Sequence, residues 1–484
     1  MRSILSLLLI FVLAVSPMHA DIMAADESGL GEQFPALQEP VHFSGNPTRD
    51  LVFITISYFV GYMPLVLMPP TLNQMPNVSK SLKGFMTGLP PVIAGVLRII
   101  TGRHTDQKGG RAAFIVPLGV SFVGLLVLAS FNYALGEEGL KELTDEDWAI
   151  LLIPMGGAVL AGTGLSTYSV AAAMSSYSGS KESAAGRQAI SGGLGNLAPG
   201  MALLMFSFLL KVLPLHYAYF ITAGVELLGT TGAVLGLNPS RYHQLLARGH
   251  DAESARQIAE THGQEMFPDL TTPSLLHTFL LRDFDGKGKL ILFNLVMDYI
   301  AITGTSFALT TFLPLALKTR MGFSPESALL LGGVFSMVTA LSRAGSGFLA
   351  SRFLHGHNKL LSYVSLAGVG IGGLGLFASG TYAPTVFGFA VLVALSQGLG
   401  KYAVVGRVKD LLQTRIGVAL GFLGCFPSLL SPLLSGAMGS LSHLDQNDGG
   451  EEDWGGVSWE YLVLPGTAVL AIVLNLATLP RASR

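Results

Sequence analysis

The chain has 484 residues and a formal net charge of −2 at pH 7; 50% of its residues are hydrophobic and 12% are charged. Soluble domains carry about 25% charged residues, so this composition excludes a water-facing globule. The near-neutral charge gives no sign of nucleic-acid binding, because the basic residues occur in short loops rather than in one patch. A mean hydropathy of +0.54 identifies an integral membrane protein whose partner is the lipid bilayer.

The sequence contains no recognisable catalytic or metal-binding pattern. Its single cysteine, Cys425, lies in an apolar segment, which leaves neither a disulfide framework nor a cysteine metal site. The histidines lack metal-ligand spacing, and there is no Walker motif, GxSxG motif or paired intramembrane carboxylate. We therefore expect no metal, no cofactor and no enzymatic activity.

Residues 1–50 form an apolar segment followed by an acidic tail. Arg2, the apolar run 4–15 and the small residue Ala20 resemble a secretory signal peptide. Three interpretations are open: a cleaved signal, an extra membrane helix, or upstream sequence before a start at Met18 or Met23. The topology derived below favours the third, because it places Asp50 in the cytoplasm.

Twelve apolar segments after the tail are long enough to cross a bilayer, which takes about 20 residues. Six lie in residues 51–237 and six in residues 290–484, on either side of a polar segment, 238–289. We therefore predict an all-α membrane protein with twelve transmembrane helices in two six-helix, pseudo-symmetric lobes. The expected spans are 51–70, 84–103, 112–135, 149–172, 189–210, 216–237, 290–317, 328–350, 360–379, 382–401, 417–440 and 458–479.

The distribution of basic residues predicts the orientation of these helices. Loops on the side of the central segment 238–289 hold about 18 lysine and arginine residues, against about 6 in the opposite loops. Basic loops remain in the cytoplasm, so the C-terminus and the central segment are predicted to be cytoplasmic. The expected location is the plasma (inner) membrane. The central segment mixes charge with sparse apolar positions, as surface helices do, and is predicted to tether the lobes or to dock a regulator.

A buried-looking arginine occurs twice in matching surroundings. Arg98 and Arg343 each lie within an apolar span, and each is followed four residues later by a glycine, Gly102 or Gly347. Charges inside a membrane span are costly and mark a pathway or a structural pair. Because snorkelling would not require the same register twice, we expect the two guanidinium groups to grip one small planar oxyanion.

The sequence around these arginines resembles the nitrate/nitrite porters of the major facilitator superfamily over most of residues 50–440. Residues 84–111 are similar to the second helix of that family, and 336–353 to its eighth. The run 190–200, Ile-Ser-Gly-Gly-Leu-Gly-Asn-Leu-Ala-Pro-Gly, is similar to its glycine-rich signature. The resemblance implies helix packing at Gly192, Gly193, Gly195 and Gly200.

The resemblance also implies a substrate cage. Arg98, Arg343 and Asn196 would bind the anion, and aromatic rings from Tyr299 and Tyr168 would sandwich it. The aromatic expected one turn after Tyr299 is replaced by Thr303, and Phe307, one turn further, is a candidate substitute. Lys401 and Tyr402 stand at the predicted end of the tenth helix, where the family pattern leads us to expect small or hydroxyl residues.

Two carboxylates in apolar surroundings, Asp298 and Glu226, are candidates for proton coupling, since a desolvated carboxylate favours its neutral form. Asp298 has a second interpretation, in which it pairs with Lys401 or with an arginine. The turn after the second helix supplies a different set: Gly102, Asp106, Lys108, Gly110 and Arg111. These are expected to brace the lobes in one conformation, with Asp106 accepting from helix N-terminal amides or a basic partner.

We therefore predict a monomeric secondary active transporter of nitrate or nitrite that works by alternating access, as a nitrate-assimilation antiporter or symporter. The alternative is a proton-coupled carrier of an organic anion, metabolite or drug. A membrane sensor is the rival from another class, and the central segment is its only large loop. The sequence does not distinguish nitrate from nitrite, import from export, or symport from exchange.

Overall fold

The computed structural model describes residues 42–45, 47–178, 181–268, 270, 286–353, 357–379, 382–411, 416–441 and 458–482. The N-terminal apolar segment, with its three interpretations, lies outside these residues. Residues from Gly45 to Arg484 form one compact unit. Within the described residues, the regular structure is helical throughout.

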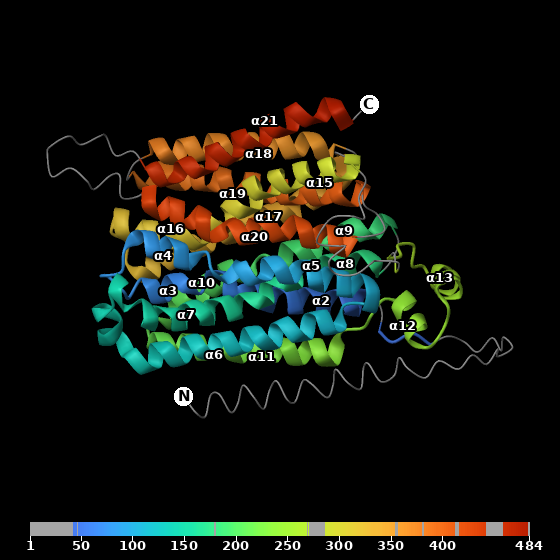
Figure 1. Ribbon diagram of the computed structural model, residues 1–484, viewed down its shortest axis with the longest axis horizontal. Helices are drawn as coiled ribbons and strands as arrows, with labels where there is room; N and C mark the ends of the chain where they lie inside the picture. Colours follow the sequence, from blue (N-terminus) through green and yellow to red (C-terminus); the bar gives the residue numbers. More distant parts are fainter. Residues whose placement is uncertain are drawn as a thin grey trace. The chain divides into compact units, whose positions relative to one another are not determined.

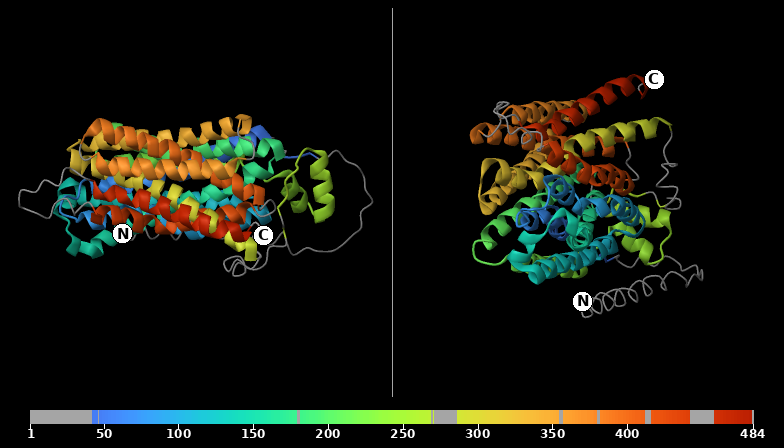
Figure 2. Two further views of the ribbon diagram at one scale, coloured as in Figure 1. Left: turned by 90° about the horizontal axis from the view of Figure 1, so that it is seen from above. Right: turned by 60° about the vertical axis from the view of Figure 1, so that its left-hand side comes forward.

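Twelve of the helices in the described residues are long and apolar enough to cross a membrane, as the hydropathy predicts. Their axes run side by side (Figures 1 and 2). The spans are Pro47–Leu72, Lys80–Lys108, Arg111–Glu142, Asp145–Tyr177, Ile190–Leu209, Leu215–Gly236, Gly288–Thr319, Pro325–Ser346, Asn358–Ala378, Ala383–Val408, Ile416–Leu441 and Trp459–Ala477.

Prolines and glycines break several spans of the first half into shorter helices, because a proline removes a backbone donor and interrupts the ladder. The α-helices of this half are α2 (Pro47–Tyr62), α3 (Met68–Leu72), α4 (Lys80–Thr87), α5 (Pro90–Lys108), α6 (Arg111–Glu142), α7 (Trp148–Ala161), α8 (Thr167–Tyr177), α9 (Lys181–Gly195), α10 (Ala198–Leu209) and α11 (Leu215–Gly236). Single 3₁₀ turns stand at Met63–Val66, Asp145–Asp147 and Gly162–Ser166.

The second half follows two short helices of the central segment, α12 (Arg241–Ala247) and α13 (Ala252–Thr261), so the segment is partly helical, as its pattern predicts. Its helices are α15 (Gly286–Tyr299), α16 (Thr305–Met321), α17 (Pro325–Phe353), α18 (Asn358–Ala378), α19 (Ala383–Leu411), α20 (Ile416–Leu441) and α21 (Val463–Ala482). A π-helical turn, Ile300–Gly304, joins α15 to α16, and a 3₁₀ turn, Trp459–Leu462, precedes α21.

Several spans are longer than predicted, and the tenth shows why. The tenth span was expected to end at Lys401, but α19 continues to Leu411. The expected end coincided with the first charged residue after the apolar run. The helix continues because Lys401 and Arg407 find polar partners inside the protein, which hydropathy does not register.

Close glycine contacts join the two halves along α5 and α20, which lie against each other in Figure 1. A Cβ on Gly102 would lie 2.2 Å from the carbonyl oxygen of Gly417, and one on Gly88 would lie 2.4 Å from the Cα of Pro432. Contacts this short leave no room for a methyl group. Backbones therefore meet at two places along α20, with α5 at Gly102 and with the link between α4 and α5 at Gly88, as small residues allow in membranes.

A second close contact joins α9 and α10 to α17. A Cβ on Gly193 would lie 2.5 Å from the Cβ of Ala344, and one on Gly200 would lie 2.8 Å from the carbonyl oxygen of Gly333. In this conformation the halves are thus in contact along two lines. Two of the four glycines of the predicted packing signature, Gly193 and Gly200, stand on the second line.

Candidate functional site

Arg98 is buried in the middle of α5, with 1% of its surface exposed. Its Nε donates to the carbonyl oxygen of Leu165 (3.2 Å), and its Nη2 donates to the hydroxyl of Tyr62 (2.9 Å). Its Nη1 reaches the other half of the chain and donates to the carbonyl oxygen of Gly424 (2.7 Å) and to Ser428 Oγ (2.5 Å). Arg98 therefore connects the halves by hydrogen bonds at the level of the apolar core.

Arg343 approaches the same place from α17 and is 3% exposed. Its guanidinium carbon lies 5.6 Å from the ring centroid of Tyr168, and that of Arg98 lies 5.4 Å from the same centroid. The side chain passes α9 at Gly192, where an added Cβ would lie 2.9 Å from Arg343 Nη2. The two arginines predicted to share a site are thus brought together on one aromatic ring.

A cluster of buried aromatic rings surrounds the arginines. The hydroxyl of Tyr299 donates to that of Tyr168 (3.0 Å), so the two predicted tyrosines are in direct contact. Phe307, the candidate substitute, lies 5.7 Å from the guanidinium carbon of Arg98. Tyr58 and Tyr62 on α2 complete the cluster, with ring centroids 4.8 Å apart. These two were not identified from the sequence, although two tyrosines four residues apart share one helix face.

A small cavity of about 10 Å³ adjoins this cluster, with room for roughly one water-sized group. Hydroxyl groups, one amide and one ammonium provide its polar lining. Asn196, in the link between α9 and α10, contributes the amide, and its Nδ2 donates to the carbonyl oxygen of Gly192 on α9. The lining residues are Leu65, Asn196, Pro199, Ser306, Phe307, Thr310, Ser336, Thr339, Ala340 and Lys401.

Lys401 is the cationic side chain that lines this cavity, and sequence reasoning did not place it in the site. It is 5% exposed, and its Nζ donates to Ser306 Oγ (2.7 Å). The same Nζ lies 5.9 Å from the ring centroid of Phe307. One feature of the sequence could have identified it: Lys401 stands where the family pattern leads us to expect a small or hydroxyl residue.

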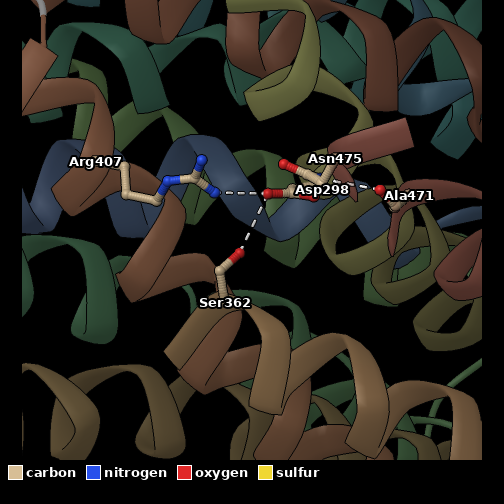
Figure 3. A network of polar contacts seen from close by, with 5 residues as sticks. All are labelled: Asp298, Ser362, Arg407, Ala471 and Asn475. Carbon is tan, nitrogen blue, oxygen red and sulfur yellow. Dashed lines mark hydrogen bonds and ion pairs between the residues drawn. The ribbon is translucent and has the colours of Figure 1, made fainter. Parts of the chain in front are cut away.

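Asp298 does not line the cavity, and its partner is an arginine rather than Lys401. Its Oδ2 accepts from Arg407 Nη1 (2.8 Å) and from Ser362 Oγ (3.3 Å), and its Oδ1 accepts from Asn475 Nδ2 (Figure 3). Asp298 is 1% exposed, so this is a buried ion pair that joins α15, α18, α19 and α21. This contact is the pairing with an arginine that the second interpretation named.

Glu226, the second carboxylate considered for proton coupling, lies on α11 and also stands outside the cavity lining. It is fully buried, and neither carboxylate oxygen has a hydrogen-bond partner among the described residues. The neighbouring hydroxyl of Ser121 donates instead to the carbonyl oxygen of Ala161 (2.7 Å). The site therefore contains no side chain from either proton-coupling candidate.

Asp106 was predicted to lie in a turn between helices, but it lies in the last helical turn of α5, where its side chain reaches the N-terminus of α20. Its Oδ1 accepts from the amide of Gly417 (3.2 Å), and its Oδ2 accepts from that of Val418 (3.0 Å). The hydroxyl of Tyr177 donates to Oδ1 (2.7 Å). A carboxylate in this position neutralises the positive end of the helix dipole. Asp106 thus makes the contact with helix N-terminal amides that the sequence predicts for it.

The turn that follows α5 depends on left-handed backbone. Gly109 and Gly110 both have φ of 86°, a conformation that side chains with a Cβ disfavour. Arg111 begins α6, and its Nη2 donates to the carbonyl oxygen of Val234 on α11. Lys108 is exposed at the end of α5. Arg111 therefore holds the turn to α11, within its own half of the chain.

The central segment docks on the same turn through His243 of α12. The Nε2 of His243 donates to the backbone carbonyl oxygen of Asp106 (3.0 Å), and its Nδ1 accepts from Ser240 Oγ (2.8 Å). Desolvation by burial lowers the pKa of His243 to about 4. The imidazole is therefore neutral at neutral pH, consistent with a ring that donates at one nitrogen and accepts at the other.

Comparison with known proteins identifies the fold. The chain superposes on the xylose transporter XylE from E. coli in a partially occluded inward-open conformation, with a TM-score of 0.62 and 14% identity over 90% of this chain and 98% of that one. It superposes on the human organic anion transporter MFSD10 (TETRAN) with a TM-score of 0.58 and 14% identity over 89% of this chain and 100% of that one. No curated protein matches the sequence significantly.

At such identities the two superpositions show the fold alone. The sequence itself carries the family: residues 51–436 match the model of the Major Facilitator Superfamily. That range includes Arg98, Arg343 and Lys401. The chain therefore belongs to the major facilitator superfamily and is an integral, multi-pass membrane transporter.

Proposed function

We propose that this transporter carries a small anion by alternating access and holds it between Arg98 and Arg343. The observation that supports this most directly is that the two guanidinium groups, one from each half of the chain, lie 5.4 and 5.6 Å from the ring of Tyr168. Among the described residues, neither arginine forms an ion pair with a carboxylate. The pair therefore offers its positive charge to a mobile anion.

Nitrate or nitrite is the anion that the sequence resemblance favours. Both are small and planar, as are the guanidinium forks that would bind them. The hydroxyl-rich lining offers hydrogen-bond donors to such an ion, although the cavity of about 10 Å³ must widen to admit it. XylE and MFSD10 are named for xylose and organic anions, and a substrate of that size would need the cavity to widen further.

The bonds that Arg98 forms across the halves suggest how binding would promote movement. Arg98 is held by Gly424 and Ser428 of α20 while the site is closed. An anion that accepts hydrogen bonds from the guanidinium would compete with these contacts and screen the repulsion between the two arginines. We infer that a monomer alternates between two access states in the plasma membrane, with its C-terminus in the cytoplasm.

The test is ion-specific uptake by the purified protein in liposomes. Nitrate and nitrite are supplied outside, with nitrite or nitrate inside, and Arg98→Ala and Arg343→Ala are measured beside the unaltered protein. Uptake that requires both arginines is the expected result. If folded protein takes up neither ion, the anion assignment is wrong, and carboxylates and cations are tested next.

A sharper test is Arg343→Lys, which keeps the charge and removes the planar fork. Hydrogen bonds to charged groups contribute about 1.5–3 kcal/mol, so we expect uptake to fall by roughly 10- to 100-fold. Gel-filtration behaviour of the purified variant is the control for folding. Uptake at the normal rate would show that the fork is not required.

A further inference from the structure

Three positively charged side chains, rather than two, meet at the site. Phe307 is close to both Arg98 and Lys401, with its ring centroid 5.7 Å from the guanidinium carbon and 5.9 Å from Nζ. Tyr168 is close to both Arg98 and Arg343. The three cations are thus grouped around two rings. They come from α17, α5 and α19.

No described carboxylate pairs with any of these three side chains. The other titratable groups around the site are Tyr58 and Tyr62 from α2, Tyr168 from α8, Tyr299 from α15 and the thiol of Cys425 from α20. Asp298 is occupied by Arg407, and Glu226 stands outside the cavity lining. The site therefore brings together basic side chains from three helices, and no carboxylate of the described residues is paired with them.

A buried cation without a negative partner is costly, and neighbouring cations add repulsion. An arginine side chain does not lose its proton in proteins, whereas a lysine side chain can. Of the three groups, only Lys401 can relieve the repulsion by changing its charge. It is also the one that lines the cavity, so a proton and an anion would reach it by the same route.

We propose that Lys401 binds and releases a proton together with the anion, which makes the carrier a proton–anion symporter without a carboxylate in its site. This inference rests on the proposed function, namely that an anion binds here. In the empty carrier the amine is neutral and forms a hydrogen bond with Ser306 Oγ, either as donor or as acceptor. In the loaded carrier the ammonium donates to the anion.

The charges balance in both directions. On one side of the membrane the amine takes one proton from water as one monovalent anion enters, and on the other side both leave. The net charge of the three cations plus cargo is then the same in the empty and the loaded carrier. Neither state has an extra unpaired charge when the lobes change conformation. The loaded carrier can therefore make the forward step of a symport cycle, and the empty carrier can make the return step.

The test follows proton and nitrate movement in the same liposomes. A nitrate gradient is imposed on the purified full-length protein, the membrane potential is clamped, and a trapped pH-sensitive dye reports protons. The unaltered protein should move about one proton for each nitrate. Any nitrate that Lys401→Arg or Lys401→Gln carries should move without a proton. Glu226→Gln is the matched control and should keep the ratio of the unaltered protein.

A binding measurement on the unaltered protein covers the case in which both Lys401 variants are inactive. Because coupling is reciprocal, the nitrate affinity should weaken by up to about tenfold per pH unit once the amine is neutral. Nitrate uptake without proton movement, coupling retained in Lys401→Arg, or an affinity independent of pH between 5 and 10 would overturn the inference and leave the proposed function intact. Absence of nitrate binding and uptake would instead overturn the proposed function.

Discussion

The two arginines at the site differ in how their charge is accommodated. Arg98 donates to two backbone carbonyls and two hydroxyls, so most of its donors are used in this structure. Its bonds to Gly424 and Ser428 cross between the halves, and they must break when the halves separate at this level. Arg343 has the face of Tyr168 as its described neighbour and Gly192 behind it. The hydrogen bonds of Arg98 therefore depend more directly on contact between the halves than the described contacts of Arg343 do.

The ion pair between Asp298 and Arg407 predicts a structural phenotype. Asp298→Asn leaves the cation of Arg407 without a negative partner, and breaking a buried pair in this way costs about 3–5 kcal/mol. We expect a lower melting temperature, measured on purified protein, with proton coupling preserved in the molecules that fold. Ser362→Ala is the control and should cost about 1 kcal/mol, because it removes one hydrogen bond. Normal stability with lost coupling would assign Asp298 a functional role instead.

Sequence reasoning placed Arg98, Arg343, Tyr168, Tyr299 and Asn196 in one site, and the structure brings these residues into one region. It did not place Lys401 there. The partners of a charged side chain are set by helices distant in sequence: 95 residues separate Lys401 from Ser306, and 109 separate Asp298 from Arg407. Hydropathy shows that a charge is buried, but only the packing shows what surrounds it.

At the scale of elements, α20 is contacted at two separate places, by α5 at Gly102 and by the link between α4 and α5 at Gly88, and this predicts opposite effects for two substitutions. Gly102→Leu should force the helices apart near Gly417, at the end that carries Asp106, and Gly88→Leu near Pro432, at the other end. The first variant should favour access from the Asp106 side, and the second access from the opposite side.

The readout for this pair is alkylation of a cysteine introduced at Thr339, which lines the cavity, in a Cys425→Ala background. A membrane-impermeant reagent is applied from one side at a time. Gly156→Leu is the control, since nothing lies within 4 Å of its added Cβ. Equal labelling of both variants from the same side would contradict the opposing effects.

The docking of α12 predicts a dependence on pH. His243 has a folded-state pKa of about 4, below its usual 6.5, so the undocked segment binds more protons between these values. Docking is therefore fully stable above about pH 6.5 and weakens as the pH falls toward 4. Between pH 7 and pH 5 the loss should be about 2 kcal/mol.

Hydrogen exchange of the amides in Arg241–Ala247 measures this docking. Protection should decrease on acidification in the unaltered protein. His243→Gln retains a donor but cannot titrate, so its protection should be weaker and independent of pH. An unaltered protein whose protection stays constant down to pH 5 would show that the ring is not the titrating group.

At the scale of the whole molecule, an anion that binds the closed site should stabilise the folded protein. A ligand at about 100 times its Kd contributes about 2.7 kcal/mol. We expect nitrate to raise the melting temperature of the purified protein, and Arg98→Ala or Arg343→Ala to remove the effect. Chloride at the same ionic strength is the control. A rise that persists in both variants would place the bound anion elsewhere.

The twelve spans could be predicted because the bilayer imposes both a length and an apolar composition on each helix. The break between α4 and α5 coincides with Gly88 and the prolines at 90 and 91, which the sequence shows, whereas the run Ile300–Gly304 contains no proline to mark its π-helical turn. The turn at 102–111 combines both: its glycines were visible in sequence, but the docking of His243 on Asp106 links segments 137 residues apart.

The glycine contacts between helices have a consequence for how this sequence can vary. At Gly162 an added Cβ would lie 1.5 Å from the carbonyl oxygen of Pro90, and Gly102 and Gly124 have similarly little space. In a library of all single substitutions, such positions should reject even alanine, while Gly156 or Gly224 accept it. The glycine positions at which alanine is not tolerated would then identify the contacts between helices, and the measurement would not depend on knowing the substrate.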